Sequence, residues 1–426
     1  MTRCAHRLLA SVLLATLARA QATPAEQSCA VCHGEEGRTE VPGAHAAAGI
    51  GCVACHGGVA GPLTADEAHA TGVRVPRGSR ATVELCGGCH ADAERMRGFR
   101  LRTDQLLLYE TSGHGKRLAA EDDPNVATCV SCHGAHGVLP ASDPRSPVHA
   151  LRQLQTCGRC HADAELMQRY ELPADVPELY RGSVHGHALL ERGALSSPAC
   201  TTCHGSHGAT PPGVDEVGRT CGRCHTPARE HFERGPHLAP ARDGTIEECV
   251  SCHGSHAVAP ATEALFVGSE AGHCGSCHQR DARALEVASN LHAQLTGLDG
   301  EVRSAENALS EAARSGLFVE RESDRLAQAR ALRGRAVPLV HALSPQALSD
   351  RLEPGRGMVA ETLDGLEKKR RELDDRKVLV LVFFVVVLCL AGVLLVHARE
   401  VAGRATGAPG SFEGEADAEL REIGRG

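Results

Sequence analysis

Pairs of cysteines followed immediately by histidine recur along this chain of 426 residues. Eighteen of its 20 cysteines fall into nine Cys-x-x-Cys-His units, and each unit combines two nucleophilic thiols with one imidazole. The nine units are Cys29-Cys32-His33, Cys52-Cys55-His56, Cys86-Cys89-His90, Cys129-Cys132-His133, Cys157-Cys160-His161, Cys200-Cys203-His204, Cys221-Cys224-His225, Cys249-Cys252-His253 and Cys274-Cys277-His278.

A single unit of this kind could form a disulfide, bind zinc, act as a redox dithiol or attach haem. Zinc ribbons would not need a histidine in the same place every time. Nine units, each with its histidine, favour covalent haem attachment, in which the thiols bond to the vinyl groups and the histidine becomes the proximal iron ligand. The spacing suits one turn of helix, which brings the three side chains to one face. We therefore expect nine c-type haems.

The motifs also form an internal repeat. CVSCHGAHG is followed by TCGRCH, CTTCHGSHG by TCGRCH, and CVSCHGSHA by HCGSCH, so that motifs two to nine fall into four pairs and the first stands alone. In these motifs the chain resembles the multihaem c-type cytochromes with doubled CxxCH motifs, over about residues 29–292. The resemblance implies a second axial histidine on most haems and a function in electron transfer.

Fourteen further histidines between the two ends of the chain compete for the nine distal positions. His136, His207 and His256 lie three residues after a proximal histidine, too close to reach the opposite face of the same iron, so each should bind a neighbouring haem. His114 and His185 share a repeated Leu-Tyr-x-x-Ser-x-His-Gly linker. The predicted distal ligands are His45, His69, His114, His136, His185, His207, His237, His256 and His292; the reserves are His149, His187, His231, His273 and His341.

Composition bounds the fold class. Aromatic residues make up only 2% of the chain, so porphyrins rather than aromatic side chains should fill the interior. Frequent Gly and Pro predict mostly loops and short helices around stacked haems in residues 21–280, the nonahaem cytochrome c domain. The net charge of −8 argues against nucleic-acid binding.

Both ends of the chain carry apolar segments. Residues 1–20 have the charged start, apolar stretch and Ala-Arg-Ala site of a secretory signal peptide. Residues 378–396 are uncharged and long enough for a transmembrane helix. Six cationic residues precede this helix and favour the opposite orientation, but a long exported domain translocates largely regardless of charge. We expect an inner-membrane protein with its haem domain in the periplasm and residues 397–426 as a cytoplasmic tail.

Residues 281–377 lack cysteine and predict a helical stalk. Apolar residues alternate at steps of four and three from Leu291 to Ala312, which indicates an amphipathic helix. A second helix is expected over 319–336, and a third from about Met358 into the membrane. The stalk could also form a subunit interface or cradle the last haem through His292 or His341.

The favoured function is electron transfer between the quinol pool or a membrane subunit and periplasmic or outer-membrane redox proteins. No residue is predicted to be catalytic. Two alternatives are direct quinol oxidation and reduction of nitrite, hydroxylamine or a sulfur oxyanion at an open haem, for which the motifs at Cys52 and Cys86 are the first candidates.

Replacing a predicted distal ligand should change the spin state of one haem. We expect His136→Ala and His207→Ala each to create one high-spin haem, because removing one axial imidazole weakens the ligand field at that iron. Electron paramagnetic resonance (EPR) of the ferric protein would measure this. An unchanged low-spin spectrum in both variants would refute the ligand rule.

Overall fold

The computed structural model describes residues 27–34, 43–61, 64–212, 214–270 and 272–406. The chain divides into two compact units, of which unit 1 comprises Met1–Ser289 with His341–Leu343 and unit 2 comprises Asn290–Val340 with Ser344–Gly426. No strand occurs in the described ranges, where the only sheet-like pairing is one bridge between Gly57 and Val73. The predicted signal peptide at 1–20 lies outside the described residues.

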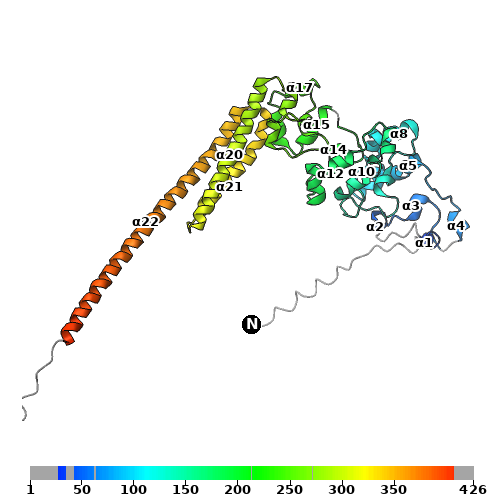
Figure 1. Cartoon of the computed structure of the whole chain (residues 1–426). Helices are drawn as coiled ribbons and strands as arrows, with labels where there is room; N and C mark the ends of the chain where they lie inside the picture. The colour runs from blue at the N-terminus through cyan, green and yellow to red at the C-terminus, as the bar shows by residue number, and fades with distance from the viewer. Residues whose placement is uncertain (1–26, 35–42, 62–63, 213, 271, 407–426) are drawn as a thin grey trace, which may run out of the picture. The chain divides into compact units, whose positions relative to one another are not determined.

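Unit 1 is built from short helices joined by loops (Figure 1). These helices are α1 (Gln27–Cys32), α2 (Ala44–Ala47), α3 (Cys52–His56), α4 (Ala65–His69), α5 (Ser79–His90), α6 (Ala93–Arg97), α7 (Gln105–Thr111), α8 (Gly113–Glu121), α9 (Cys129–His133), η1 (Ala150–Arg152), α10 (Gln153–His161), α11 (Ala164–Arg169), α12 (Val176–Arg181), α13 (Val184–Gly186), η2 (His187–Glu191), α14 (Cys200–His204), α15 (Val214–Gly222), α16 (Thr226–Phe232), α17 (Leu238–Arg242), α18 (Val250–His253), η3 (Glu263–Phe266) and α19 (Cys274–Cys277). The prediction of short helices and loops is confirmed for this part of the chain.

Local sequence explains why several motif helices last only about one turn. In the second, fourth, sixth and eighth motifs a glycine follows the histidine directly and has a positive φ, which is 78° at Gly134 and 80° at Gly205. Glycine adopts this conformation at little cost, and it ends the helix. The helix therefore spans the two cysteines and the histidine and no more, as in α9 and α14.

Unit 1 buries few apolar side chains for its length. One small cluster contains Val83, Leu118 and Val126, against which Leu106 and Tyr109 pack. The longer unit 1 contains fewer of the buried apolar residues than unit 2 does. Hydrophobic burial by side chains alone would therefore stabilise unit 1 weakly, since the driving force scales with the apolar area removed from water.

Unit 2 consists of long helices that pack through an apolar stripe. They are α20 (Ala282–Arg314, which enters the unit at Asn290), α21 (Glu320–Ala336) and α22 (Pro345–Thr406), with the 3-10 helix η4 (Val337–Ala342) between the last two. The predicted stripe is buried in its first half, where Leu291 and Leu298 are 0% exposed. Leu326 of α21 and Leu352 of α22 are buried as well. These alternating steps produce the close helix packing expected of such a pattern.

Ion pairs border this apolar contact. Arg333 of α21 lies 2.7 Å from Asp299 of α20, and Lys369 of α22 lies 2.7 Å from Glu322 of α21. Burial opposes ionisation of Glu322, but the ammonium of Lys369 outweighs it and holds the pKa of the carboxyl below its ordinary value. Since Glu322 is buried, its charge depends on this partner.

The prediction that the third helix begins near Met358 is wrong. Helix α22 begins at Pro345 and continues through Pro354. Proline suits the first position of a helix, but inside one it removes a backbone hydrogen bond. Here packing outweighs local propensity: a Cβ added at Gly355 would lie 3.4 Å from side chains of both Leu298 and Leu332, so the three helices meet at this glycine.

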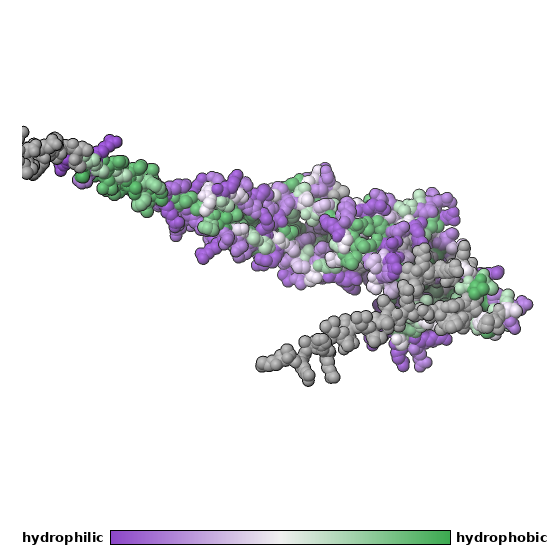
Figure 2. All heavy atoms as spheres, turned by 90° about the horizontal axis from the view of Figure 1, so that it is seen from below, coloured by the Kyte–Doolittle hydropathy of each residue, from purple (hydrophilic) through white to green (hydrophobic). Residues whose placement is uncertain are grey.

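The C-terminal half of α22 is long and apolar enough to cross a membrane. Its apolar stretch is not buried, and Figure 2 shows the green apolar surface along this helix between purple flanks. The helix continues to Thr406, ten residues past the predicted span, so the predicted tail begins as helix. Residues 407–426 lie outside the described part of the chain.

Removing a buried leucine should destabilise unit 2. We expect Leu298→Ala to lower the free energy of unfolding by about 2–5 kcal/mol, because it leaves a cavity where three helices meet. Urea unfolding of the detergent-solubilised protein, followed by the far-UV circular dichroism of its helices, would measure this. The control is Leu363→Ala, since Leu363 is 39% exposed; equal midpoints for the two variants would contradict the packing argument.

Candidate functional site

Each of the nine motif histidines faces a second histidine. The ring centroids of the two partners are 5.8–6.3 Å apart in every pair. The pairs are His33–His69, His56–His136, His90–His45, His133–His207, His161–His114, His204–His256, His225–His185, His253–His341 and His278–His237.

This separation matches two imidazoles bound to opposite faces of one metal ion. A metal–imidazole bond of about 2 Å on each side, plus about 1 Å from each nitrogen to its ring centre, places the centroids about 6 Å apart. The described residues contain no cluster of three or more His, Cys, Asp or Glu side chains that could hold a metal ion alone. Two protein ligands suit haem iron, whose four other ligands are porphyrin nitrogens.

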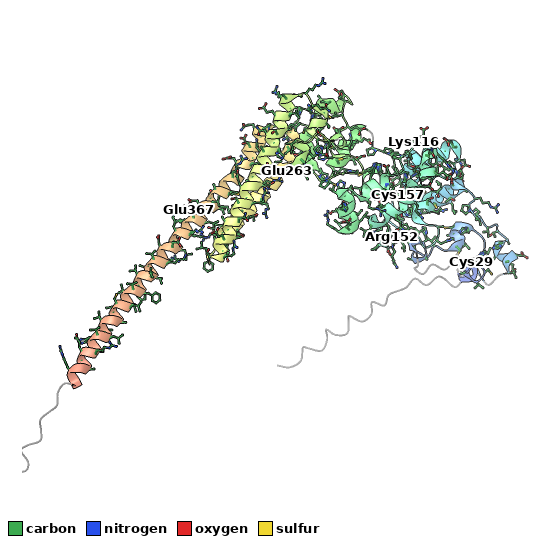
Figure 3. All side chains as sticks on the ribbon, in the orientation of Figure 1. Cys29, Lys116, Arg152, Cys157, Glu263 and Glu367 are labelled. Carbon is green, nitrogen blue, oxygen red and sulfur yellow. The ribbon has the colours of Figure 1, made fainter. Side chains whose placement is uncertain are left out.

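The motif cysteines are accessible for covalent attachment of a cofactor. All cysteines in the described ranges are free thiols, and those of the motifs are partly or fully exposed. Cys29 and Cys157, labelled in Figure 3, begin the first and the fifth motif. Each thiol pair is close in sequence to a paired histidine, so one short segment could supply both thioether bonds and one axial ligand to a c-type haem.

The Gly-x-His histidines follow one rule. His136 belongs to the fourth motif and faces the second, His207 belongs to the sixth and faces the fourth, and His256 belongs to the eighth and faces the sixth. The prediction that each serves another motif agrees with this arrangement. In every case the partner is the motif two places earlier, so the even-numbered motifs are linked in series.

The linker histidines face the odd-numbered motifs, and backbone hydrogen bonds position them. The residue before His114 donates its N–H to the carbonyl of Ala209, two residues after His207. Equivalent bonds join Ala44 to Val138 and Val184 to Val258. Within each of these motif pairs, the loops that present the two distal candidates are therefore tied together.

In the Leu-Tyr-x-x-Ser-x-His-Gly linker the tyrosine, the serine and the glycine each have a structural role. The Tyr109 hydroxyl donates to the carbonyl of Ala127 at 2.9 Å, and the Ser112 hydroxyl donates to the carbonyl of Tyr109 at 2.6 Å. The same hydroxyl accepts from the N–H of Gly115 at 3.0 Å and caps α8. A Cβ on Gly115 would lie 2.0 Å from the Tyr109 carbonyl oxygen, so only glycine fits after His114.

The second copy of the linker repeats these contacts. Tyr180 donates to the carbonyl of Pro198, and Ser183 caps the helix at Gly186. A Cβ on Gly186 would lie 2.1 Å from the carbonyl oxygen of Tyr180. The linker therefore fixes the conformation of the first turn of a helix, and the histidine lies on that turn.

Burial lowers the pKa of many paired histidines below the ordinary value, and the neighbouring histidine adds to the effect in several pairs. The affected side chains are His90, His114, His133, His161, His185, His207, His237, His253 and His256. The neutral imidazole favoured by this shift is the form that binds metals.

Backbone carbonyls orient two of the motif rings. The Nδ1 atom of His56 lies 2.9 Å from the carbonyl oxygen of Arg74, and that of His204 lies 3.1 Å from the carbonyl oxygen of Thr210. A hydrogen bond at Nδ1 fixes the tautomer and leaves Nε2 as the metal-binding atom.

Consecutive motifs from the second to the ninth lie beside each other. Burial, together with thiols of the following motif, raises the pKa of Cys55, Cys132, Cys203 and Cys252. Between one motif pair and the next, the contact is made by the first cysteine of each motif. A hydrogen bond with Cys86 lowers the pKa of Cys129 to about 7, and a hydrogen bond with Cys249 lowers the pKa of Cys221 to about 7.

Two arginines add contacts within the motif pairs. Arg159 of the fifth motif donates to the carbonyl of Ser131 in the fourth, and Arg223 of the seventh donates to the carbonyl of Thr202 in the sixth. Both arginines occupy the position before the second cysteine. The repeated TCGRCH sequence thus holds each of these two pairs together.

Among the predicted distal ligands, the structure brings His45, His69, His114, His136, His185, His207, His237 and His256 to motif histidines. It does not do so for His292, which takes part in no such ring pair among the described residues. His341, named only as a reserve, faces His253 instead. His69 faces His33, so the first motif, which stands outside the four motif pairs, also has a facing histidine.

Two other reserve histidines have structural contacts. The Nδ1 atom of His149 accepts from the N–H of Leu151 at 3.4 Å and caps η1. His187 lies 2.6 Å from Glu191 on the surface. Together with His231 and His273, they take part in no pair with a motif histidine in the described ranges.

Comparison with known proteins supports a c-type cytochrome. The chain is similar to the high-molecular-weight cytochrome c of Nitratidesulfovibrio vulgaris, with 28% identity over 223 residues, 48% of this chain and 34% of the relative. The chain thus spans about a third of that relative's length. No family model matches the chain, and no solved structure matches it. The similarity and the many cysteines support covalently bound haem and electron transfer.

A methyl group at Gly115 should disturb one haem site, because its contact with the Tyr109 carbonyl must move the turn that carries His114. We expect Gly115→Ala to produce a high-spin fraction at one haem, measured by EPR and visible absorption. Gly113→Ala is the matched control, since its Cβ would meet only the Ala209 oxygen at 3.8 Å. Indistinguishable spectra for the two variants would contradict this account of the linker.

Proposed function

We propose that this protein is a membrane-anchored cytochrome c with nine haems that carries electrons between the membrane quinol pool, or a membrane subunit, and periplasmic or outer-membrane acceptors. The observation that carries the proposal is the pairing of every motif histidine with a second imidazole at about the separation that one iron requires. Bound haem supplies one-electron redox chemistry.

The pairing argues for conduction rather than catalysis. A haem that reduces nitrite, hydroxylamine or a sulfur oxyanion needs a free coordination position for the substrate. The motifs at Cys52 and Cys86 were the candidates for an open haem, but His56 faces His136 and His90 faces His45. Axial imidazoles on both faces leave no position for substrate, and they favour low reduction potentials compared with His/Met ligation.

The adjacency of the motifs supports an electron path through unit 1. From the second motif to the ninth, cysteines of each motif interact with cysteines of the next. Groups attached at these positions would stand in the order of the chain, so electrons would pass between sequence neighbours. The two arginine contacts hold the fourth motif to the fifth and the sixth to the seventh.

The apolar helix supports attachment to a membrane. Its span at 378–396 is uncovered in the described structure, as expected for a surface that faces lipid. Together with the predicted signal peptide at 1–20, this helix supports an inner-membrane protein with its haem domain in the periplasm and the end of its chain in the cytoplasm. Redox proteins are the proposed partners, and the stalk at 281–377 offers a surface for self-association.

The proposal is tested by the haem content and spin state of the purified holoprotein. We expect nine haems per chain by pyridine haemochrome assay and mass spectrometry, and a ferric EPR spectrum that contains only low-spin, bis-histidine signals. Redox titration should show a set of transitions at low potential. Fewer than nine haems, or a stoichiometric high-spin signal, would contradict it.

Substrate and donor assays separate the alternatives. Nitrite and hydroxylamine should neither reoxidise the reduced protein catalytically nor alter its spectrum, since no iron position is free to bind them. Turnover with either would establish the reductase alternative. Reduction of the isolated protein by a quinol analogue would show that the protein oxidises quinol directly. If reduction requires a membrane subunit, quinol oxidation belongs to that subunit.

A further inference from the structure

The series of Gly-x-His ligands ends before the eighth motif is served. The second, fourth and sixth motifs each face a Gly-x-His histidine from the motif two places later. The eighth motif would need a tenth, but the chain has nine, and the residue three positions after His278 is Asp281. The repeat therefore cannot supply a partner for His253.

His341 occupies the missing position. Its ring centroid lies 6.1 Å from that of His253, with the rings inclined by 42°, within the range of the other pairs. Both residues belong to unit 1, although the chain on either side of His341–Leu343 belongs to unit 2. His341 is 63 residues beyond the last motif and four residues before the start of α22.

The surroundings of His341 repeat those of the Gly-x-His loops. In the earlier motif pairs, the loop of the linker histidine contacts the loop of the Gly-x-His histidine. In the last pair, the linker histidine is His237, and a Cβ on Gly235 would lie 2.6 Å from the carbonyl oxygen of His341. Glycine at position 235 thus lets the backbone of His341 take the place of the absent loop.

The backbone beside His341 is strained. Leu343 has a φ of 49°, in the left-handed region that branched or bulky residues seldom adopt. Strained residues persist where the surrounding structure over-determines them, and they cluster at sites that clamp a ligand. A requirement to hold His341 at a fixed distance from His253 would account for the conformation of the segment.

We infer that His341 is the distal axial ligand of the haem attached at Cys249 and Cys252, and that His292 is not an axial ligand. The inference rests on the proposed function and completes it, because it assigns a second imidazole to the haem of the eighth motif, which the repeat leaves without one. The ligand comes from the segment between two long helices, outside the cytochrome repeats. No haem then retains a free coordination position.

The test compares three full-length holoproteins: wild type, His341→Ala and His292→Ala. We expect one of the nine haems in His341→Ala to become high-spin by EPR and to return to low spin when imidazole is added. His292→Ala should keep the wild-type spectrum. An all-low-spin spectrum for His341→Ala, or a high-spin haem in His292→Ala, would overturn the inference.

His341→Met keeps the test decisive if the alanine variant fails to accumulate. Methionine opposite His253 should give one His/Met haem, visible as a single redox transition shifted to higher potential, because thioether ligation raises the potential. An unchanged titration would refute the assignment. A wild-type protein with fewer than nine haems would instead refute the proposed function, so the two failures are distinguishable.

Discussion

The separation between paired imidazoles is the constraint on which the rest of unit 1 depends. Nine pairs hold nearly the same centroid distance, although the partners lie from 36 to 88 residues apart in the sequence. Short helices, glycine stops and the caps on α8 and α13 all set the positions of these rings. The small apolar cluster of unit 1 would not by itself fix so many long-range distances. In the proposed holoprotein, axial bonds and thioethers take over much of the work of a hydrophobic core.

Unit 2 is stabilised differently, by the burial of its own side chains. Its helices bury leucines along a continuous stripe, and charged pairs such as Arg333–Asp299 border that stripe. The apolar stretch of α22 then leaves the packed bundle without a partner helix among the described residues. One chain therefore combines a unit whose proposed stability comes from cofactors with a unit whose stability comes from side-chain burial.

Local features of the fold could be predicted from the sequence because their causes are local. The Cys-x-x-Cys-His spacing, the apolar stripe from Leu291 and the apolar span at 378–396 each depend on residues within a few turns of one another. The start of α22 was predicted too late because Pro354 suggests a break in the helix. Two leucines that are distant in sequence approach Gly355 closely, and this packing favours a continuous helix.

The partner of His253, in contrast, depends on a contact between residues that are distant in sequence. Position in the sequence favoured His292 as a distal ligand and left His341 as a reserve, and only the three-dimensional structure shows that the ring of His341 faces His253. The sequence does contain one signal for this pairing. Because each Gly-x-His histidine serves the motif two places earlier, the last even-numbered motif must take its ligand from outside the repeat.

Because the even-numbered motifs face histidines that come later in the chain, the order of synthesis affects the order of ligation. A chain that emerges and folds from its N-terminus presents His56 long before His136, and His253 long before His341. Under the proposed ligation, each even-numbered iron waits with one face open while later segments follow, and the eighth waits until His341 emerges, four residues before α22 begins. Maturation of the cofactor array would thus be complete only as the chain reaches its membrane anchor. A chain truncated before that point would retain a reactive iron.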